Sequence, residues 1–517
     1  MIPEETGIYL QIKNGEALLH DLDPFLEGLN LTPMMQGMPL KDFLTQVLVS
    51  AGSPIQLRDI ELTRPIGIAI MSENDEDMMI FIPLSEIAEP EVLADNLRFS
   101  ETSWTALHDG YLIISTQAAL LETFPPERTA DVAILRDYPE NTLQTYINYS
   151  TLVESLDMDM QEAANEADLD VEGNAVVAQF LELYSTMLEH FDAMGMAFRF
   201  DGTGLGVRAD MELSGELAAL VRTMKPYAGA LEYPVPRLPN TVFASVSAMR
   251  SEDSLRWLHA IETRISEDQE ATDILAPFFA MSREYLELRT GLSALSVALN
   301  PITDKTELLN SDIPVTFDLV MVEETRDRNA YMNMTRGWIE ESQVLPMITG
   351  FFAEELEVSL EYTVADGVTP AGREYQEFIF TFDGPEDAAN MAALFNSYRI
   401  YQHAEGDRVY TCIGTRGSEM IDAVLNAPAQ PVNHSADIEP YSVWEFDLVA
   451  ALHAVDPEAA TGMPDETEPW TGHMGMHNDG YTSEMSMPMA YLQGMMQFMT
   501  AAMNEQQSET GEIKQKM

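Results

Sequence analysis

Short stretches of alternating apolar and polar residues recur along the chain, and most of them run directly into a stretch with helical spacing. Residues 7–12 alternate, for example, and residues 17–22 then repeat their apolar side chains at helical spacing. A period of two is typical of a strand, and a period of about 3.6 is typical of an amphipathic helix. The same change of period follows residues 145–149, 242–246, 443–446 and 483–487. The pattern predicts repeated strand–helix units.

Two other units consist of a hairpin followed by a helix, and both occur in the same order in each half of the chain. Asp-Gly and similar pairs between alternating stretches are strong hairpin signals. The first unit, 66–97, has its counterpart in 358–395, and the second, 103–124, has its counterpart in 401–425. We infer an internal duplication, because the pattern and the order agree although the residue identities do not.

These units predict an α+β fold in which antiparallel, curved sheets carry long helices packed on one face, duplicated into two similar halves. The first half is expected to span residues 1–232 and the second residues 241–503. The segment between them, 233–240, contains three prolines and predicts a stiff, extended connector. Residues 456–481 are expected to form an acidic loop, and residues 504–517 a disordered tail.

Acidic residues far outnumber basic ones: the 517 residues include 86 Asp and Glu but only 27 Lys and Arg, a formal net charge of −59. A nucleic-acid partner is excluded, because such a surface must neutralise phosphates with Lys and Arg. Anionic membranes would also repel the chain, and it has no run of about eighteen apolar residues that would predict a transmembrane helix. The carboxylate-rich surface suits an exported protein that meets brine, or a cytoplasmic protein of a salt-accumulating organism.

The first residues of the chain bear on its location. Residues 1–6 contain neither a basic nor an apolar stretch, so the sequence as written is expected to carry no secretion signal. Residues 2–6 with the strand after them, residues 108–114 and residues 238–243 resemble a broad class of uncharacterised exported bacterial proteins. The resemblance covers roughly residues 2–500. It implies export to the periplasm or cell surface, an α+β repeat fold and no catalytic residues.

The single cysteine excludes an intramolecular disulfide and a zinc site built on cysteines. Cys412 lies in an alternating stretch and is expected to be a small buried residue of a strand. Residues 202–206 have the spacing G-x-G-x-G, but no Walker lysine follows and no strand-to-helix context surrounds them. We therefore interpret them as a hairpin turn and not as a phosphate-binding loop.

Two segments carry residue types that bind metals. His473, Met474, Met476 and His477 combine imidazole and thioether groups, which suit Cu(I). The alternative for this segment is a flexible, glycine-rich loop. Asp168, Asp170 and Glu172 are spaced like the first half of an EF-hand calcium loop, but Gln179 stands where that loop needs a bidentate Glu. The alternative there is a solvated turn.

The clearest helix signal lies between residues 174 and 191. Seven apolar residues fall there on one stripe: Val177, Phe180, Leu181, Tyr184, Met187, Leu188 and Phe191. We expect this stripe either to belong to the core or to form one wall of an apolar groove.

The sequence contains none of the nucleophile or zinc-protease motifs G-x-S-x-G, S-x-x-K and H-E-x-x-H. We therefore predict a non-enzymatic exported binding or scaffold protein without a cofactor, whose partner is an unknown small molecule or protein. One form of this hypothesis is a carrier of apolar ligands. Two alternatives remain open: a hydrolase that uses acidic residues, and a copper-binding exported protein that uses residues 472–477.

The net charge leads to a prediction about stability in salt. Self-repulsion among carboxylates weakens as the Debye length falls from about 10 Å at 0.1 M salt to about 3 Å at 1 M. We expect the melting temperature to be higher in 1 M NaCl than in dilute buffer. Thermal melts followed by circular dichroism at both ionic strengths check this, and a melting temperature that salt leaves unchanged or lowers contradicts it.

Overall fold

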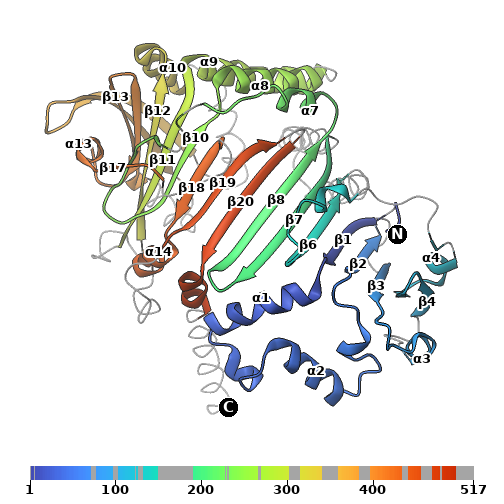
Figure 1. Cartoon of the computed structure of the whole chain (residues 1–517). Coiled ribbons are helices and arrows are strands. Elements are labelled where there is room, and N and C mark those ends of the chain that lie inside the picture. The colour runs from blue at the N-terminus through green and yellow to red at the C-terminus, as the bar shows by residue number, and fades with distance from the viewer. Residues whose placement is uncertain are drawn as a thin grey trace, which may run out of the picture. The chain divides into compact units, whose positions relative to one another are not determined.

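The computed structural model describes residues 2–4, 6–71, 77–96, 103–122, 124–125, 132–149, 190–227, 229, 232–265, 269–301, 315–340, 359–383, 396–432, 440–455, 468–477 and 480–496. The chain divides into two compact units (Figure 1). Unit 1 comprises Met1–Arg222 and His477–Gln493, and unit 2 comprises Thr223–Met476 and Gly494–Met517. Both units combine helices with antiparallel strands, which confirms this part of the predicted fold class.

The sheet of unit 1 has the strand order β4-β5-β3-β2-β1-β6-β7-β8-β20, and every one of these pairings is antiparallel. Its strands are β1 (Thr6–Ile12), β2 (Ile66–Met71), β3 (Met78–Pro83), β4 (Trp104–His108), β5 (Tyr111–Ser115), β6 (Thr142–Asn148), β7 (Phe191–Asp201), β8 (Gly204–Leu213) and β20 (Gly480–Pro488). Its helical segments are α1 (Gly15–Gly28), η1 (Thr32–Met35), α2 (Leu40–Ser50), η2 (Leu57–Asp59), α3 (Pro90–Asn96), α4 (Ala118–Glu122), η3 (Ala133–Leu135) and α7 (Gly215–Val221).

The sheet of unit 2 has the order β13-β14-β15-β16-β12-β11-β10-β18-β19, again antiparallel throughout. Its strands are β10 (Thr241–Ala248), β11 (Arg289–Pro301), β12 (Val315–Thr325), β13 (Ser359–Val368), β14 (Glu374–Asp383), β15 (Arg399–Glu405), β16 (Arg408–Gly414), β18 (Ser442–Phe446) and β19 (Trp470–His477). Its helices are α8 (Ser251–Ile265), α9 (Gln269–Leu288), α10 (Arg328–Glu340), α13 (Glu419–Asn426) and α14 (Leu448–Val455).

Two tight turns were identifiable in the sequence. Asp109 and Gly110, between β4 and β5, have φ angles of 47° and 75°. Both values lie in the left-handed region that a two-residue hairpin turn requires, and Asp and Gly adopt that region most readily. Residues 202–203 join β7 to β8, and the Asp201 carboxylate accepts a hydrogen bond from the Thr203 N–H at 2.8 Å. The prediction of a hairpin turn at residues 202–206 is confirmed.

Helix α1 illustrates how the sequence specifies a strand–helix unit. The Asn14 side chain accepts a hydrogen bond from the Ala17 N–H at 3.0 Å and so caps the first turn. Leu18 and Phe25 are buried on its apolar stripe. Phe25 meets Phe200 of β7 edge to face, with ring centroids 5.2 Å apart. This contact fixes α1 against one face of the unit 1 sheet.

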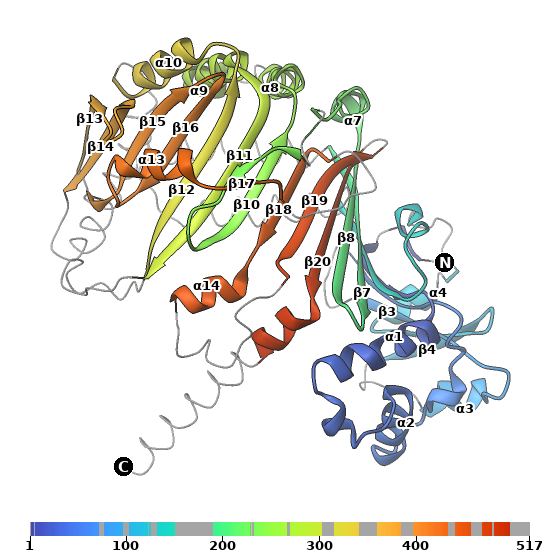
Figure 2. The same ribbon diagram turned by 60° about the vertical axis from the view of Figure 1, so that its left-hand side comes forward.

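Helices pack against both faces of the unit 2 sheet. Tyr331 of α10 packs with Val409 of β16, whereas Met420 and Val424 of α13 pack with Cys412 of the same strand. Residues three apart on a strand point to opposite faces, so α10 and α13 lie on opposite sides of the sheet (Figure 2). The prediction of helices on one face is therefore wrong for this unit, because both faces of β16 are apolar.

Cys412 is fully buried in its strand, as predicted.

Two segments expected to be connectors or loops take part in unit 2. Val235–Pro236 forms β9, which pairs with β17 (Ala429–Gln430), so the proline-rich segment 233–240 packs against the sheet core. Residues 470–477 form β19, which corrects the prediction of a loop over 456–481. Residues 456–467 and the tail 504–517 lie outside the described residues.

The first predicted repeat pairing is also wrong. The hairpin β2–β3 joins the next hairpin through β5, the second strand of that hairpin. The hairpin β13–β14 joins the next hairpin through β15, the first strand of that hairpin. The strand orders of residues 66–115 and 359–414 therefore differ, although both segments read as two hairpins in sequence.

Several glycines lie directly beneath aromatic rings on the sheets. Gly472 of β19 is opposite Trp444 of β18, and a Cβ added to Gly472 would overlap the indole ring. Gly67 lies in the same way beneath Tyr9, and Gly367 beneath Tyr375. Glycine has no side chain to contribute at such positions, and the neighbouring ring covers the space instead.

We predict that Gly472→Ala destabilises unit 2 by about 1–3 kcal/mol, because the Trp444 ring must shift to admit the new methyl group. Gly337 of α10 serves as a matched control, since a Cβ there meets nothing within 4 Å. Gly337→Ala should stabilise the chain by about 0.5–1 kcal/mol, because alanine favours the helix. Chemical denaturation measures both changes, and equal effects of the two substitutions would contradict the packing argument.

Candidate apolar binding faces

The unit 1 sheet has two unlike faces, which are clearest on β7. Ala193, Gly195 and Ala197 are buried on one face, where Tyr138 and Tyr146 pack closely against the two alanines. Met194 and Met196, between them in sequence, are only half-buried on the other face. On β7 the small residues thus point to the packed side, and the large apolar residues point to the other side.

The second face continues across six neighbouring strands. Two rows of paired apolar residues cross β2, β1, β6, β7, β8 and β20. One row is Ile66, Ile12, Leu143, Phe198, Val207 and Met485, and the other is Ile70, Ile8, Ile147, Met194, Met211 and Tyr481. All twelve side chains are half-buried and none is fully buried. At about 4.8 Å per strand the rows are about 24 Å long. We call these rows, with Met196 between them, the unit 1 apolar face.

The environment of this face is of low polarity. Burial raises the pKa of Tyr481 to about 12, as expected where an ionised phenolate loses its hydration. Phe25 of α1 covers the end of the face at Phe200. At another edge, Tyr149 packs against Phe191, with ring centroids 6.0 Å apart. Methionine side chains are flexible and polarizable, so the face can adapt its shape to what it contacts.

Unit 2 has a face of the same kind. A row of half-buried residues crosses seven strands of its sheet: Trp470, Phe446, Phe243, Val297, Leu319, Ile413 and Ile400. The opposite face carries the buried row Val443, Val246, Ala294 and Val322, each at most 2% exposed. We call the first row, with its neighbour Met321 on β12, the unit 2 apolar face.

One buried carboxylate lies on the same side of β12 as Leu319 and Met321. Glu323 is fully buried, and its two carboxylate oxygens accept hydrogen bonds from the hydroxyls of Tyr285 and Tyr331. Arg289 Nε lies 2.9 Å from Glu323 Oε1 and neutralises its charge. Burial raises the pKa of Tyr331 and of Tyr285 far above the usual value. Both tyrosines therefore stay protonated as donors, and the network ties α9 and α10 to the sheet.

Two of the four candidate copper ligands, His473 and Met474, do not point toward each other. His473 and Met474 are consecutive on β19, so their side chains point to opposite faces of the strand. His473 is 4% exposed, whereas Met474 is 41% exposed. The same Met-Gly-Met sequence occurs on β7 as Met194-Gly195-Met196, where it is part of a sheet face. The repeated motif is thus a strand feature in both places. Within the described ranges, no three His, Cys, Asp or Glu side chains cluster as metal ligands would.

Most of the other candidate residues lie outside the described residues. This holds for Asp168, Asp170 and Glu172, and for Val177, Phe180, Leu181, Tyr184, Met187 and Leu188. Phe191, the last member of the predicted helical stripe, begins strand β7. Its assignment to the helix is wrong, because the alternation of β7 starts there.

Burial also raises the pKa of the Cys412 thiol to about 12, which leaves it protonated and unreactive at neutral pH.

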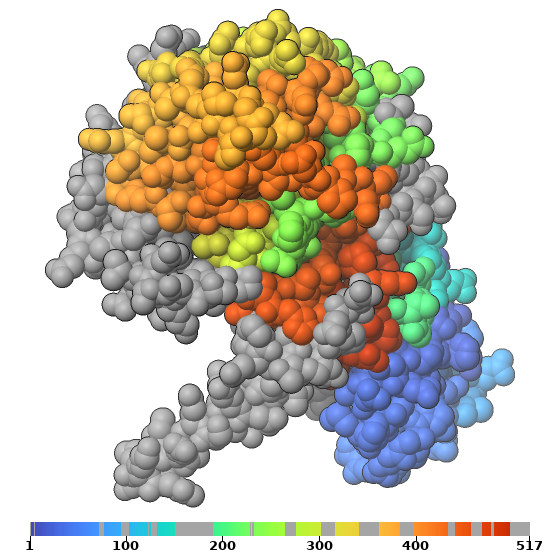
Figure 3. Space-filling view, turned by 90° about the vertical axis from the view of Figure 1, so that its left-hand side faces the viewer, coloured from blue at the N-terminus to red at the C-terminus, as the bar shows by residue number. Residues whose placement is uncertain are grey.

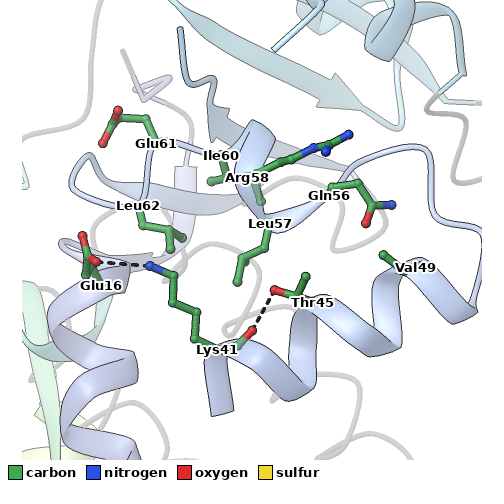
Figure 4. A pocket seen from close by; sticks show the side chains of 10 residues that line it. All are labelled: Glu16, Lys41, Thr45, Val49, Gln56, Leu57, Arg58, Ile60, Glu61 and Leu62. Carbon is green, nitrogen blue, oxygen red and sulfur yellow. Dashed lines mark hydrogen bonds and ion pairs between the residues drawn. The ribbon is translucent and has the colours of Figure 1, made fainter. Parts of the chain in front are cut away.

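A separate pocket of about 650 Å³ lies in unit 1 between α1, α2 and the segment around η2 (Figure 4). Lys41 of α2 and Glu16 of α1 face each other across it, with Lys41 Nζ 3.1 Å from Glu16 Oε1. The ten residues that line it are Glu16, Lys41, Thr45, Val49, Gln56, Leu57, Arg58, Ile60, Glu61 and Leu62. Four of the ten are charged, so this pocket is not the continuous apolar cavity expected of a carrier.

Comparison with protein-family models, with curated proteins and with solved structures gives no match. In the part of the chain that the structure describes, no helix is both long enough and apolar enough to cross a bilayer.

Sequence reasoning missed both apolar faces. The signal that could have found them is the alternation of small and large side chains along each strand. Residues 193–198 alternate small and large apolar side chains, and so do residues 294–297 in part. A period of two in side-chain volume marks which face is closely packed even where both faces are apolar.

We predict that Tyr331→Phe destabilises the chain by about 1–3 kcal/mol, because it leaves one buried oxygen of Glu323 without a donor. In a Glu323→Leu background the same substitution should cost much less, since no carboxylate remains to be satisfied. A double-mutant cycle by urea unfolding measures this coupling. Equal costs of Tyr331→Phe in the two backgrounds would show that the hydroxyl does not act through Glu323.

Proposed function

We propose that the chain is a non-enzymatic, exported binding protein that carries apolar ligands, with one binding face in each unit. The observation that supports this proposal is the contrast between the two sides of each sheet. One side is closely packed and fully buried, and the other carries large apolar residues that are only half-buried. The apolar area that remains exposed favours the binding of an apolar ligand, because each Å² of it that the ligand covers contributes about 25 cal/mol to the free energy of binding.

The chemistry of the two faces favours an uncharged ligand body. The rows that define them contain Ile, Leu, Val, Phe, Met, Trp and Tyr, but no charged side chain. A cation or anion placed there would lose hydration without gaining a counter-charge. An apolar molecule, or the apolar part of a lipid, avoids this cost.

We also propose that the two units descend from a duplication. In this proposal the strands of the two units correspond differently from the repeats predicted from the sequence. The order β4-β5-β3-β2-β1-β6-β7 in unit 1 matches β15-β16-β12-β11-β10-β18-β19 in unit 2. Chain order matches too, apart from the hairpin β13–β14, which is an insertion in this scheme. The predicted match of residues 103–124 with residues 401–425 is retained. The predicted match of residues 66–97 with residues 358–395 is replaced by a match of the hairpin β2–β3 with the hairpin β11–β12.

The helices agree with this correspondence. Helix α4 follows β5 and packs on the Ile113 side, as α13 follows β16 and packs on the Cys412 side. Helix α3 follows β3 and packs on the Leu112 side, as α10 follows β12 and packs on the Val409 side. Two apolar faces per chain are what a duplicated binding module would provide.

The proposal predicts two binding events per chain for a neutral apolar fluorophore such as N-phenyl-1-naphthylamine. Met196→Asp should remove binding in unit 1, and Met321→Asp should remove it in unit 2, because each places a charge on one apolar face. Each variant should bind one fluorophore, and the double variant none. Fluorescence titration of the full chain gives the stoichiometry.

The matched control is Met34→Asp, the same substitution at a side chain that is 75% exposed and belongs to neither row. Its titration should coincide with that of the unchanged chain. Circular dichroism of each variant establishes that it folds. Absence of saturable binding by the unchanged chain, or equal losses in Met34→Asp and Met196→Asp, would overturn the proposal.

A further inference from the structure

The outer edge of β15 in unit 2 is occupied by another strand. Residues Gln376, Glu377 and Phe378 of β14 pair with Gln402, Tyr401 and Ile400 of β15. This pairing leaves Tyr401 only 4% exposed, and the Tyr375 ring meets it edge to face at 5.5 Å. The hairpin β13–β14, in yellow-orange, lies at the outer surface of unit 2 in the space-filling view (Figure 3).

Strand β4 is the counterpart of β15 under the proposed duplication. Each is the first strand of a hairpin with a two-residue turn. The last residue pair before the turn is His108 with Tyr111 in the hairpin of β4, and Glu405 with Arg408 in the hairpin of β15. Counting back from these pairs aligns Trp104 with Tyr401. It also aligns Thr105 with Gln402, the residue that pairs with β14.

The edge of β4 has no such cover among the described residues. There β4 pairs with β5 alone, and it forms the end of the unit 1 sheet (Figure 1). Trp104 is 42% exposed and Leu107 is 45% exposed, whereas Tyr401 is buried. The neighbouring helices contact the faces of the sheet: Thr105 Oγ1 donates to the Ala94 C=O of α3 at 3.0 Å. Among the described residues, nothing pairs with the outer backbone edge of β4.

The sequence of β4 lacks three features that often protect a sheet edge, namely charged residues, proline and a bulge. Natural edge strands carry charged residues, proline or a bulge that discourage pairing with another chain. Residues 104–108 read Trp-Thr-Ala-Leu-His, without an acidic residue, a lysine or a proline. In a chain with 86 acidic residues, a neutral edge that presents Trp104 and Leu107 is unusual.

We propose that the β4 edge binds an extended segment of a partner protein, which adds to the unit 1 sheet as an antiparallel strand. The partner strand would stand where β14 stands on β15, with an aromatic or aliphatic side chain beside Trp104 and without a net negative charge. A second copy of this chain is disfavoured as the partner, because two molecules of charge −59 repel each other. This inference rests on the proposed duplication, but it does not depend on ligand binding at the apolar faces.

The backbone geometry identifies the groups that would pair. The residues that flank a two-residue turn exchange both of their hydrogen bonds across the hairpin. His108, Ala106 and Trp104 therefore direct their N–H and C=O groups toward β5. Thr105 and Leu107 direct theirs outward, as Gln402 does toward β14.

The test uses a fluorescein-labelled peptide that copies residues 374–382 of β14, with lysine at both glutamate positions. Fluorescence anisotropy with the full chain should show saturable binding of one peptide per chain. Leu107→Pro removes an outward N–H, and Trp104→Ala removes the aromatic contact. Each should weaken binding at least tenfold. Phe317→Ala, which truncates an exposed aromatic side chain in unit 2, is the control and should leave binding unchanged.

Three outcomes would overturn the inference: no saturable binding, equal binding by the two β4 variants and the unchanged chain, or a dimer in 1 M NaCl that Leu107→Pro abolishes. The last outcome would make a second copy the occupant. Circular dichroism of Leu107→Pro shows whether that variant folds. Its binding of N-phenyl-1-naphthylamine, measured in parallel, separates failure of this inference from failure of the proposed apolar carrier.

Discussion

The close packing of one face of each sheet is the constraint on which the rest of the structure depends. In unit 2 this face is made of Ala244, Val246, Ala294 and Val322, each at most 2% exposed. Small side chains let α13 and the segment around Val235 approach the strands closely, as the density of protein interiors requires. Because strands alternate, the neighbouring residues Phe243, Leu295 and Met321 point to the other face, where they are only half-buried. The half-buried row of unit 2 thus lies on the same strands as the closely packed face.

Rings pair with glycines on both kinds of sheet face, since Tyr9 belongs to the packed core of unit 1 and Trp444 lies on the same side of β18 as Phe446. A Cβ added to Gly472 would overlap the Trp444 ring, and one added to Gly67 would overlap the Tyr9 hydroxyl. The two glycines therefore leave the space that the rings occupy. A ring placed over a glycine contacts the neighbouring strand, and such cross-strand contacts stabilise a sheet. Glycine at these positions therefore strengthens the sheet, although glycine in a strand ordinarily weakens it.

Much of the local structure could be predicted from the sequence, but its assembly could not. Alternation located β2, β3 and β5, and His108-Asp109-Gly110 located a turn, because these features depend on neighbouring residues. The strand β19 was missed because Gly472 and Gly475 suggested a loop; only the facing Trp444 explains the first of them. The partner of each hairpin was also missed, since β3 joins β5 and β14 joins β15 by contacts distant in sequence. The two apolar faces depend on the same distant pairings.

The strong negative charge and the apolar faces are compatible because they act over different distances. A net charge of −59 repels other copies of the chain over a Debye length, about 10 Å at 0.1 M salt. Contact between apolar surfaces acts only when water is excluded, within a few ångströms. Two copies therefore meet a barrier before their apolar residues touch, whereas a small uncharged molecule meets none. The acidic composition thus opposes self-association through the half-buried apolar faces, and under the proposed function it does not oppose an uncharged ligand. It also restricts any partner of the neutral β4 edge to a segment that the surrounding carboxylates do not repel.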